Sequence, residues 1–214
     1  MTLAQYIDHT LLKADTDTKA VTQLCNEAIE NNFRSVCVPP YFVSLAVELL
    51  EATPVKVVTV IGFPMGYAAT PAKVEEAKRA IQEGADEIDV VVNVAAIKDK
   101  NWSYVKNDVN SLTTTAHLQG KIVKIIFETA LLTEAEIIQL CEICNENEVN
   151  YVKTATGFNG VNTSPEIIRF LKNHINSEIK IKASGGIRSK EQALALIKAG
   201  ANRIGTSRSL QIIE

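Results

Sequence analysis

The sequence repeats one pattern eight times, in which a short apolar run rich in β-branched residues precedes an amphipathic stretch of helical length. Such runs are typical of buried strands, and strands that alternate with helices form parallel sheets. We predict strands near residues 5–9, 34–38, 55–61, 86–92, 121–127, 149–154, 178–183 and 202–205. We predict helices near residues 17–31, 40–51, 70–83, 101–117, 133–147, 163–174, 189–199 and 206–212.

Local signals mark where several of these helices begin. Thr133 precedes "EAEI", and Glu136 three residues later completes a capping box. Pro71 and Pro165 each follow Thr or Ser at the start of a predicted helix, where proline is well tolerated.

Eight βα units without a break in composition favour an α/β fold, a single (β/α)8 TIM barrel with a parallel eight-stranded core over residues 1–214. At about 27 residues per unit, this is a compact member of the class. A doubly wound open sheet is the alternative. No G-x-G-x-x-G follows the first predicted strand, which weakens the dinucleotide-binding version of that alternative.

Composition narrows the partners and the compartment. The net charge is only −3, and no basic stripe indicates nucleic-acid binding. No apolar stretch approaches the roughly 20 residues of a membrane span, and the N-terminus does not resemble a signal peptide. We therefore expect a cytoplasmic protein with small-molecule partners, with neither nucleic acid nor membrane among them.

The four cysteines and three histidines do not indicate a metal site. Cys141 and Cys144 form a C-x-x-C, but they lie within a predicted helix and no second C-x-x-C is present. The histidines are scattered along the chain. We expect two thiols on a helix face, no metal and no cofactor.

Side-chain alternation along the predicted strands places charges inside the barrel. In the strand near 178–183, Ile181 suits the helix-facing side, so Lys182 points inward near the C-terminal end. Lys153 opposes its neighbours in the strand near 149–154 in the same way, and Asp89 and Lys124 also point inward. A structural ion-pair network would explain this arrangement without any catalysis. Active sites of TIM barrels lie at the C-terminal ends of the strands, however, which favours a functional role.

Two lysines in one confined space favour carbonyl chemistry. A second cation and partial desolvation both disfavour the ammonium form, so one amine becomes free near neutral pH. A free lysine amine attacks a carbonyl to form a Schiff base, whose protonated form accepts electrons from a breaking C–C bond. These residues therefore predict a metal-independent, Schiff-base (class I) aldolase.

Glycine-bearing segments follow the last two predicted strands, where TIM barrels often bind phosphate. Glycines allow backbone N–H groups to approach an anion closely, and nearby hydroxyl and guanidinium groups add donors. The candidate phosphate-binding and substrate-binding residues here are Thr156, Gly157, Gly185, Gly186, Ile187, Arg188, Gly205 and Ser207.

The chain resembles deoxyribose-phosphate aldolases of the short bacterial type over nearly its full length. The resemblance rests on "IDHTLLK" (7–13), "VCVPP" (36–40), "VIGFPMG" (60–66), "EIDVVVN" (87–93), "KIIFET" (124–129), "VKTATGF" (152–158), "KASGGIR" (182–188) and "RIGTS" (203–207). It implies a lyase that reversibly cleaves 2-deoxy-D-ribose 5-phosphate to D-glyceraldehyde 3-phosphate and acetaldehyde.

The resemblance also implies roles for residues. Lys153 corresponds to the Schiff-base nucleophile, Lys182 to the lysine that perturbs it, and Asp89 to the acid/base partner. Lys124 belongs to the same network. Asp8 and Thr10, at the top of the first strand, are expected to bind substrate hydroxyls.

Two positions depart from the family pattern. Ala155 stands where many relatives carry serine, and Arg208 stands where relatives often have a small residue. Two other functions remain open, namely a different phosphosugar lyase or isomerase that uses Lys153 electrostatically, and a non-catalytic phosphosugar-binding barrel. A homodimer is considered, although nothing in the sequence specifies an oligomeric state.

Overall fold

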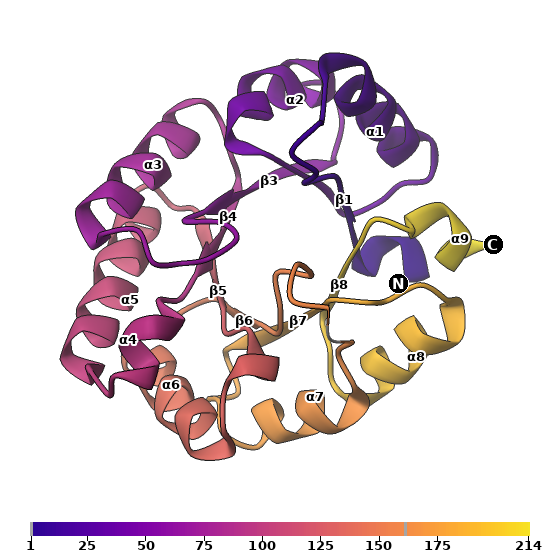
Figure 1. Ribbon diagram of the computed structural model, residues 1–214. Coiled ribbons are helices and arrows are strands. Elements are labelled where there is room, and N and C mark those ends of the chain that lie inside the picture. The colour runs from indigo at the N-terminus through magenta and orange to yellow at the C-terminus, as the bar shows by residue number, and fades with distance from the viewer. Residues whose placement is uncertain (1, 161) are drawn as a thin grey trace.

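The computed structural model, which describes residues 2–160 and 162–214, is a closed barrel of eight parallel strands surrounded by helices (Figure 1). The strands pair in chain order, and β8 closes the ring against β1. The predicted (β/α)8 TIM barrel is therefore confirmed, and the open-sheet alternative is wrong. The strands are β1 (Ile7–Thr10), β2 (Ser35–Val38), β3 (Lys56–Ile61), β4 (Glu87–Val91), β5 (Ile122–Ile126), β6 (Tyr151–Lys153), β7 (Lys180–Ser184) and β8 (Arg203–Thr206).

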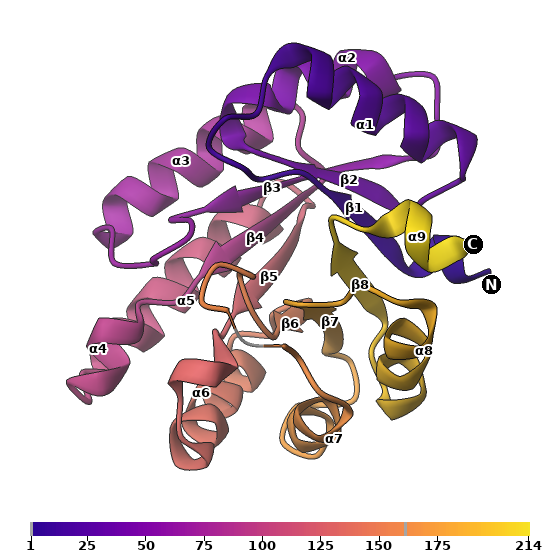
Figure 2. The ribbon, with the colours of Figure 1, turned by 45° about the vertical axis from the view of Figure 1, so that its right-hand side comes forward.

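The helices lie outside the barrel, and the chain ends meet on one side of it (Figure 2). The C-terminal helix α9 contacts both β1 and the N-terminal 3-10 helix η1 (Leu3–Tyr6). In the described part of the chain, no helix is both long and apolar enough to cross a membrane. The α-helices are α1 (Thr18–Glu30), α2 (Val43–Leu50), α3 (Thr70–Gln82), α4 (Val94–Lys98), α5 (Trp102–His117), α6 (Glu134–Glu146), α7 (Pro165–Lys172), α8 (Lys190–Ala199) and α9 (Ser209–Ile213).

The predicted helix starts are confirmed where the capping chemistry is local. The capping box of Thr133 and Glu136 begins α6, with both reciprocal hydrogen bonds present. Pro71 lies in the first turn of α3, and Pro165 is the first residue of α7. These ends were predictable because a cap depends on residues within one turn.

Several boundaries differ from the prediction, including the last helix α9, which begins at Ser209 rather than near residue 206. Residues 3–6 form η1 rather than the start of the first strand. A 3-10 turn (η2, Pro40–Phe42) precedes α2, so that helix begins three residues later than expected. The short helix α4 was not predicted, and Asn93 caps it by accepting a hydrogen bond from the N–H of Ala96.

The barrel separates an apolar layer from a polar interior. Outward-facing strand residues such as Ile88, Val90 and Ile181 pack with the helices in one continuous core. Burying a side chain of this size contributes about 1.5–3 kcal/mol, so this layer stabilises the fold. Cys141 and Cys144 lie buried in it on α6 as free thiols, in agreement with the expectation of two helix-face cysteines.

Candidate active site

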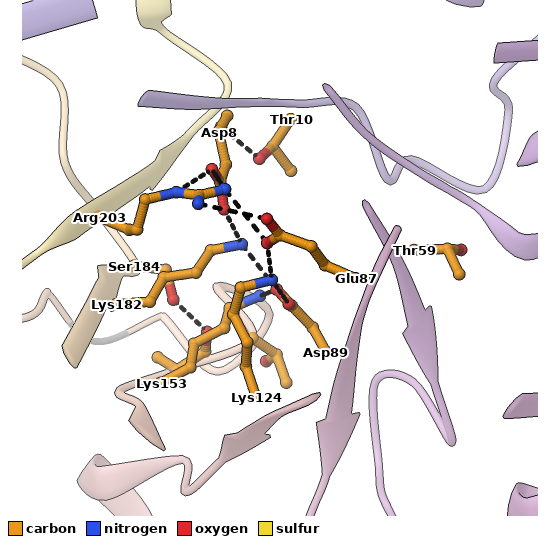
Figure 3. A network of polar contacts seen from close by, with 12 residues as sticks. Asp8, Thr10, Thr59, Glu87, Asp89, Lys124, Lys153, Lys182, Ser184 and Arg203 are labelled. Carbon is orange, nitrogen blue, oxygen red and sulfur yellow. Dashed lines mark hydrogen bonds and ion pairs between the residues drawn. The ribbon is translucent and has the colours of Figure 1, made fainter. Parts of the chain in front are cut away.

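The interior of the barrel holds a buried network of charged side chains, each no more than 3% exposed (Figure 3). A charge removed from water is tolerated only when it is paired, so the contacts within this network decide its chemistry. Its members are Asp8, Glu87, Asp89, Lys124, Lys153, Lys182 and Arg203.

Asp89 on β4 is the centre of the network. Its Oδ1 accepts a hydrogen bond from Lys124 Nζ at 2.8 Å. Its Oδ2 accepts from Lys153 Nζ at 2.8 Å and from Lys182 Nζ at 2.7 Å. The inward orientation expected from strand alternation is confirmed for all four residues.

A second layer of ion pairs lies around Arg203 at the start of β8. Its Nε donates to Asp8 Oδ1 at 2.7 Å, and its other nitrogens donate to the Glu87 carboxylate at 3.2 and 3.3 Å. Glu87 also pairs with Lys124 at 2.6 Å, and Asp8 pairs with Lys182 at 2.5 Å. Arg203 was not predicted to lie in this network, although side-chain alternation along the last strand places it inward beside Lys182.

The balance of charge singles out Lys153. The network contains four cationic side chains but three carboxylates, so one cation is in excess when all are ionised. Lys124 and Lys182 each pair with two carboxylates, and Arg203 also pairs with two. Lys153 pairs with Asp89 alone, which it shares with both other lysines. Loss of the proton from Lys153 therefore costs the fewest ion pairs and balances the charge.

The pKa shifts agree with this reasoning. Burial, together with the nearby charge of Lys182, lowers the pKa of Lys153 despite the opposing effect of Asp89. Burial also acts to lower the pKa of Lys182, but Asp8 and Asp89 outweigh it and raise that pKa. Burial acts to raise the pKa of Asp89, but Lys124 and the other two lysines hold it well below its usual range. Of the three lysines in the network, Lys153 is thus the one whose pKa is lowered.

The placement of Asp8 differs from the expectation that it binds substrate hydroxyls. Asp8 is fully buried, and its carboxylate contacts Lys182, Arg203 and the Ser35 hydroxyl. Asp8 does not line the pocket above the network. Thr10, two residues later, does line the pocket, and its hydroxyl donates to the Asp8 carbonyl at 2.8 Å. The structure therefore favours a role for Asp8 in holding Lys182, and it leaves Thr10 in the wall of the pocket.

A pocket of about 300 Å³ opens at the C-terminal end of the barrel, with Lys153 in its wall. Its lining includes three exposed cations, Lys13, Arg188 and Arg208, and none of the lining residues is acidic. No carboxylate of the described residues forms an ion pair with these three side chains. The lining residues are Thr10, Leu11, Leu12, Lys13, Lys153, Thr156, Gly157, Phe158, Ser184, Gly185, Gly186, Ile187, Arg188, Gly205, Thr206, Ser207 and Arg208.

The loop after β7 lines the pocket and contains two glycines with positive φ. Gly185 and Gly186 adopt φ of 98° and 70°, which glycine tolerates best. A Cβ at Gly186 would lie 1.7 Å from Asn162 Oδ1, so a side chain there would displace the preceding loop. The cationic rim and this turn together suit a phosphate group.

Gly205, expected to bind phosphate, also leaves space inside the barrel. A Cβ at this position would lie 3.0 Å from Lys182 Cε and 3.2 Å from Ser184 Cβ. Glycine therefore leaves room for the Lys182 side chain inside the barrel, while its backbone lines the pocket. Its small size matters more here than its conformational freedom.

Hydrogen bonds join the loops that follow β6 and β7. The Thr154 hydroxyl donates to the Ser184 carbonyl at 2.8 Å, and the Ser184 hydroxyl donates to the Ala155 carbonyl at 2.5 Å. The Thr163 N–H donates to the Gly185 carbonyl at 3.0 Å. These bonds hold the turn that follows Lys153 against the neighbouring glycine turn.

Several lining residues were not singled out from the sequence, among them Lys13 and Phe158. Lys13 ends the "IDHTLLK" motif, and its charge could have identified it. Phe158 packs edge-on against Phe63, with ring centroids 5.1 Å apart, and covers one side of the mouth. No periodic signal marks Phe158, because its partner lies in a different loop.

A closed (β/α)8 barrel, a buried lysine of lowered pKa in the pocket wall and a cationic rim are features of enzymes that act on phosphorylated carbonyl compounds through a lysine. The sequence matches the profile of the DeoC/LacD family aldolases over residues 2–207. The chain belongs to this family.

Similar proteins carry more specific names. A deoxyribose-phosphate aldolase from Thermococcus gammatolerans is 47% identical, with 100% of this chain and 96% of the relative covered. One from Clostridium perfringens is 45% identical, with 99% and 94% covered. The structure of deoxyribose phosphate aldolase from Aeropyrum pernix, described as a unique tetramer, matches with a TM-score of 0.92 at 32% identity and covers 99% of this chain and 89% of that one.

Proposed function

We propose that this protein is a deoxyribose-phosphate aldolase, a lyase that reversibly cleaves 2-deoxy-D-ribose 5-phosphate to D-glyceraldehyde 3-phosphate and acetaldehyde through a Schiff base. The observation that carries this proposal is the excess cation of the buried network. Lys153 shares its one carboxylate with two better-paired lysines and lies in the pocket wall. Such an amine is free to attack an aldehyde.

The reaction begins at Lys153 Nζ. The neutral amine adds to C1 of the open-chain sugar, and loss of water leaves a protonated imine. The C3 hydroxyl loses its proton, the electron pair of the C2–C3 bond moves to the imine as an enamine, and glyceraldehyde 3-phosphate departs. Protonation of the enamine carbon and addition of water to the imine then release acetaldehyde.

Asp89 and Lys182 are proposed to move the protons. One oxygen of Asp89 holds both Lys153 and Lys182, at 2.8 and 2.7 Å. Because the pKa of Lys182 is raised, Lys182 stays protonated and can return a proton through this shared oxygen. Lys124 occupies the other oxygen of Asp89 and fixes its orientation.

The phosphate is proposed to bind at the turn of Gly185, Gly186, Ile187 and Arg188 and at the Gly205–Ser207 loop. The exposed Arg188 side chain supplies charge there, and Ser207 supplies a hydroxyl. Thr156 and Gly157, three and four residues after Lys153, line the same pocket.

We propose in addition that residues 1–214 form one catalytic domain and that the protein acts in the cytoplasm on small molecules alone. We propose a homodimer as its assembly. Light scattering of the purified protein measures the mass of the assembly in solution directly.

Borohydride trapping tests the Schiff base. Acetaldehyde followed by borohydride should convert Lys153 to N-ethyl-lysine, detected by mass on the peptide that contains it. Lys153→Ala should abolish both labelling and turnover. Lys180→Met, which removes an exposed lysine from the next strand, is the control and should label like wild type. Phosphosugar binding without any label would instead support a non-catalytic barrel.

A further inference from the structure

Glu128, directly after β5, has an unusual backbone conformation and a buried carboxylate. Its φ and ψ are both 56°, in the left-handed region that non-glycine residues seldom adopt. The residue is 3% exposed. Neither the charge network below it nor the proposed reaction uses this group.

The conformation follows from an irregularity in the pairing of β5 with β6. The N–H of Phe127 donates to the Lys153 carbonyl at 2.9 Å, and that of Thr129 donates to the Thr154 carbonyl at 2.9 Å. Between these two bonds the chain after β5 advances by two residues, from Phe127 to Thr129. The chain after β6 advances by only one, from Lys153 to Thr154, as in a β-bulge. Glu128 is the extra residue, and the bulge directs its side chain beyond Lys153 toward the next turn.

The carboxylate of Glu128 binds Thr156 twice. Its Oε2 accepts hydrogen bonds from the Thr156 N–H at 3.2 Å and from the Thr156 hydroxyl. No lysine, arginine or histidine of the described residues forms an ion pair with Glu128. Its contacts with protein donors therefore converge on one threonine.

These bonds fix the direction of hydrogen bonding at Thr156. A hydroxyl has one proton and two lone pairs, and the Thr156 proton is already donated to Glu128. One lone pair accepts from the Phe158 N–H at 3.1 Å. The remaining lone pair leaves Thr156, a lining residue of the pocket, able to accept but not to donate.

We propose that Glu128 is a positioning residue that determines specificity, because it makes Thr156 a hydrogen-bond acceptor for a hydroxyl of the substrate. This inference rests on the proposed aldolase function. Thr156 lies on the turn that begins at Lys153, and the glycine turn for the phosphate forms another wall of the same pocket. Its partner is therefore the hydroxyl on the carbon between the reacting carbonyl and the phosphate, which is C2 of glyceraldehyde 3-phosphate.

Two acceptor aldehydes test the inference in the aldol direction with acetaldehyde. D-glyceraldehyde 3-phosphate carries the hydroxyl, and 3-phosphooxypropanal lacks it. We expect wild type to favour the hydroxylated acceptor in kcat/KM by about three- to tenfold, the range that one hydrogen bond provides. Thr156→Val should bring this ratio close to one.

Two variants of Glu128 separate positioning from general damage. Glu128→Ala should lose most of the preference, because the freed Thr156 hydroxyl rotates. Glu128→Gln should retain it, because the amide oxygen still accepts from Thr156. If Glu128→Ala does not fold, the ratio of kcat/KM between the two acceptors in Thr156→Val and Glu128→Gln still tests the inference.

The outcomes distinguish failure of the inference from failure of the proposed function. A full preference in Glu128→Ala or Thr156→Val, or no preference in wild type, overturns the inference while the aldolase stands. Loss of the preference in Glu128→Gln as complete as in Glu128→Ala also overturns it, because the amide oxygen introduced by Glu128→Gln would still accept from Thr156. Absence of any aldol product and of any trapped lysine in wild type would overturn the aldolase itself.

Discussion

At the scale of single residues, the site depends on unequal sharing of carboxylates among similar lysines. Lys124 and Lys182 are each held by two carboxylates, and their pKa values are raised despite burial. Lys153 has one shared carboxylate, and burial lowers its pKa. Three side chains of identical chemistry thus differ in pKa because of their neighbours.

Lys182→Met should therefore shift the pH dependence of catalysis. The substitution removes a cation near Lys153 and leaves Asp89 with fewer partners, so the pKa of Lys153 should rise. The free-amine fraction at neutral pH then falls, and the rate of borohydride trapping should need a higher pH to reach its plateau. Identical trapping profiles in Lys182→Met and wild type would contradict this role, and Lys180→Met serves as the control on the same strand.

At the scale of elements, a second buried ion pair connects α3, α5 and β4. Lys73 Nζ lies 2.5 Å from Asp108 Oδ2 and donates to the Val91 carbonyl at 2.9 Å. The Thr70 hydroxyl donates to Asp108 Oδ1 at 2.8 Å. The first turn of α3 is thus tied to the neighbouring helix and to the end of the strand that carries Asp89.

Removal of Lys73 alone should be costly to stability. Lys73→Met leaves Asp108 as an uncompensated buried charge and should lower the free energy of unfolding by about 3–5 kcal/mol. The double variant Lys73→Met with Asp108→Asn contains no orphaned charge. Its loss of unfolding free energy should therefore be clearly less than the sum of the losses in the two single variants. Urea denaturation of the four proteins measures this coupling, and strictly additive costs would show that the pair does not interact.

At the scale of the whole molecule, the barrel interior couples folding to pH. Burial acts to raise the pKa values of Asp8, Glu87 and Asp89, but the surrounding cations lower all three in the folded state. Groups with lowered carboxyl pKa values contribute stability above their unfolded pKa, which is about 4. That contribution is lost as the pH falls through the folded values. Because these residues lie on strands around the ring, their protonation should affect the entire barrel together.

We expect the urea midpoint to fall steeply once the pH drops below about 4, where the unfolded carboxyls take up protons. Glu87→Gln should lower the urea midpoint at pH 7. It should also make the fall of the midpoint below about pH 4 less steep, because one of the three paired carboxylates no longer titrates. Glu166→Gln is the control, since the pKa of Glu166 is also lowered but its side chain is exposed. If Glu166→Gln reduces the pH dependence of the urea midpoint in acid as much as Glu87→Gln does, the effect does not come from the carboxylates of the barrel interior.

The sequence by itself determined the eightfold βα order, most helix starts and the inward side of the strands, because these features depend on residues a few positions apart. It also identified Asp89, Lys124, Lys153 and Lys182 as one inward group, since strand alternation is a local rule. Only the tertiary structure decided how these charges pair. Arg203 meets Asp8 from the other end of the chain, Gly205 makes room for Lys182, and a bulge directs Glu128 to Thr156. These contacts depend on the register between strands when the ring closes, and that register places residues up to 195 positions apart within hydrogen-bonding distance.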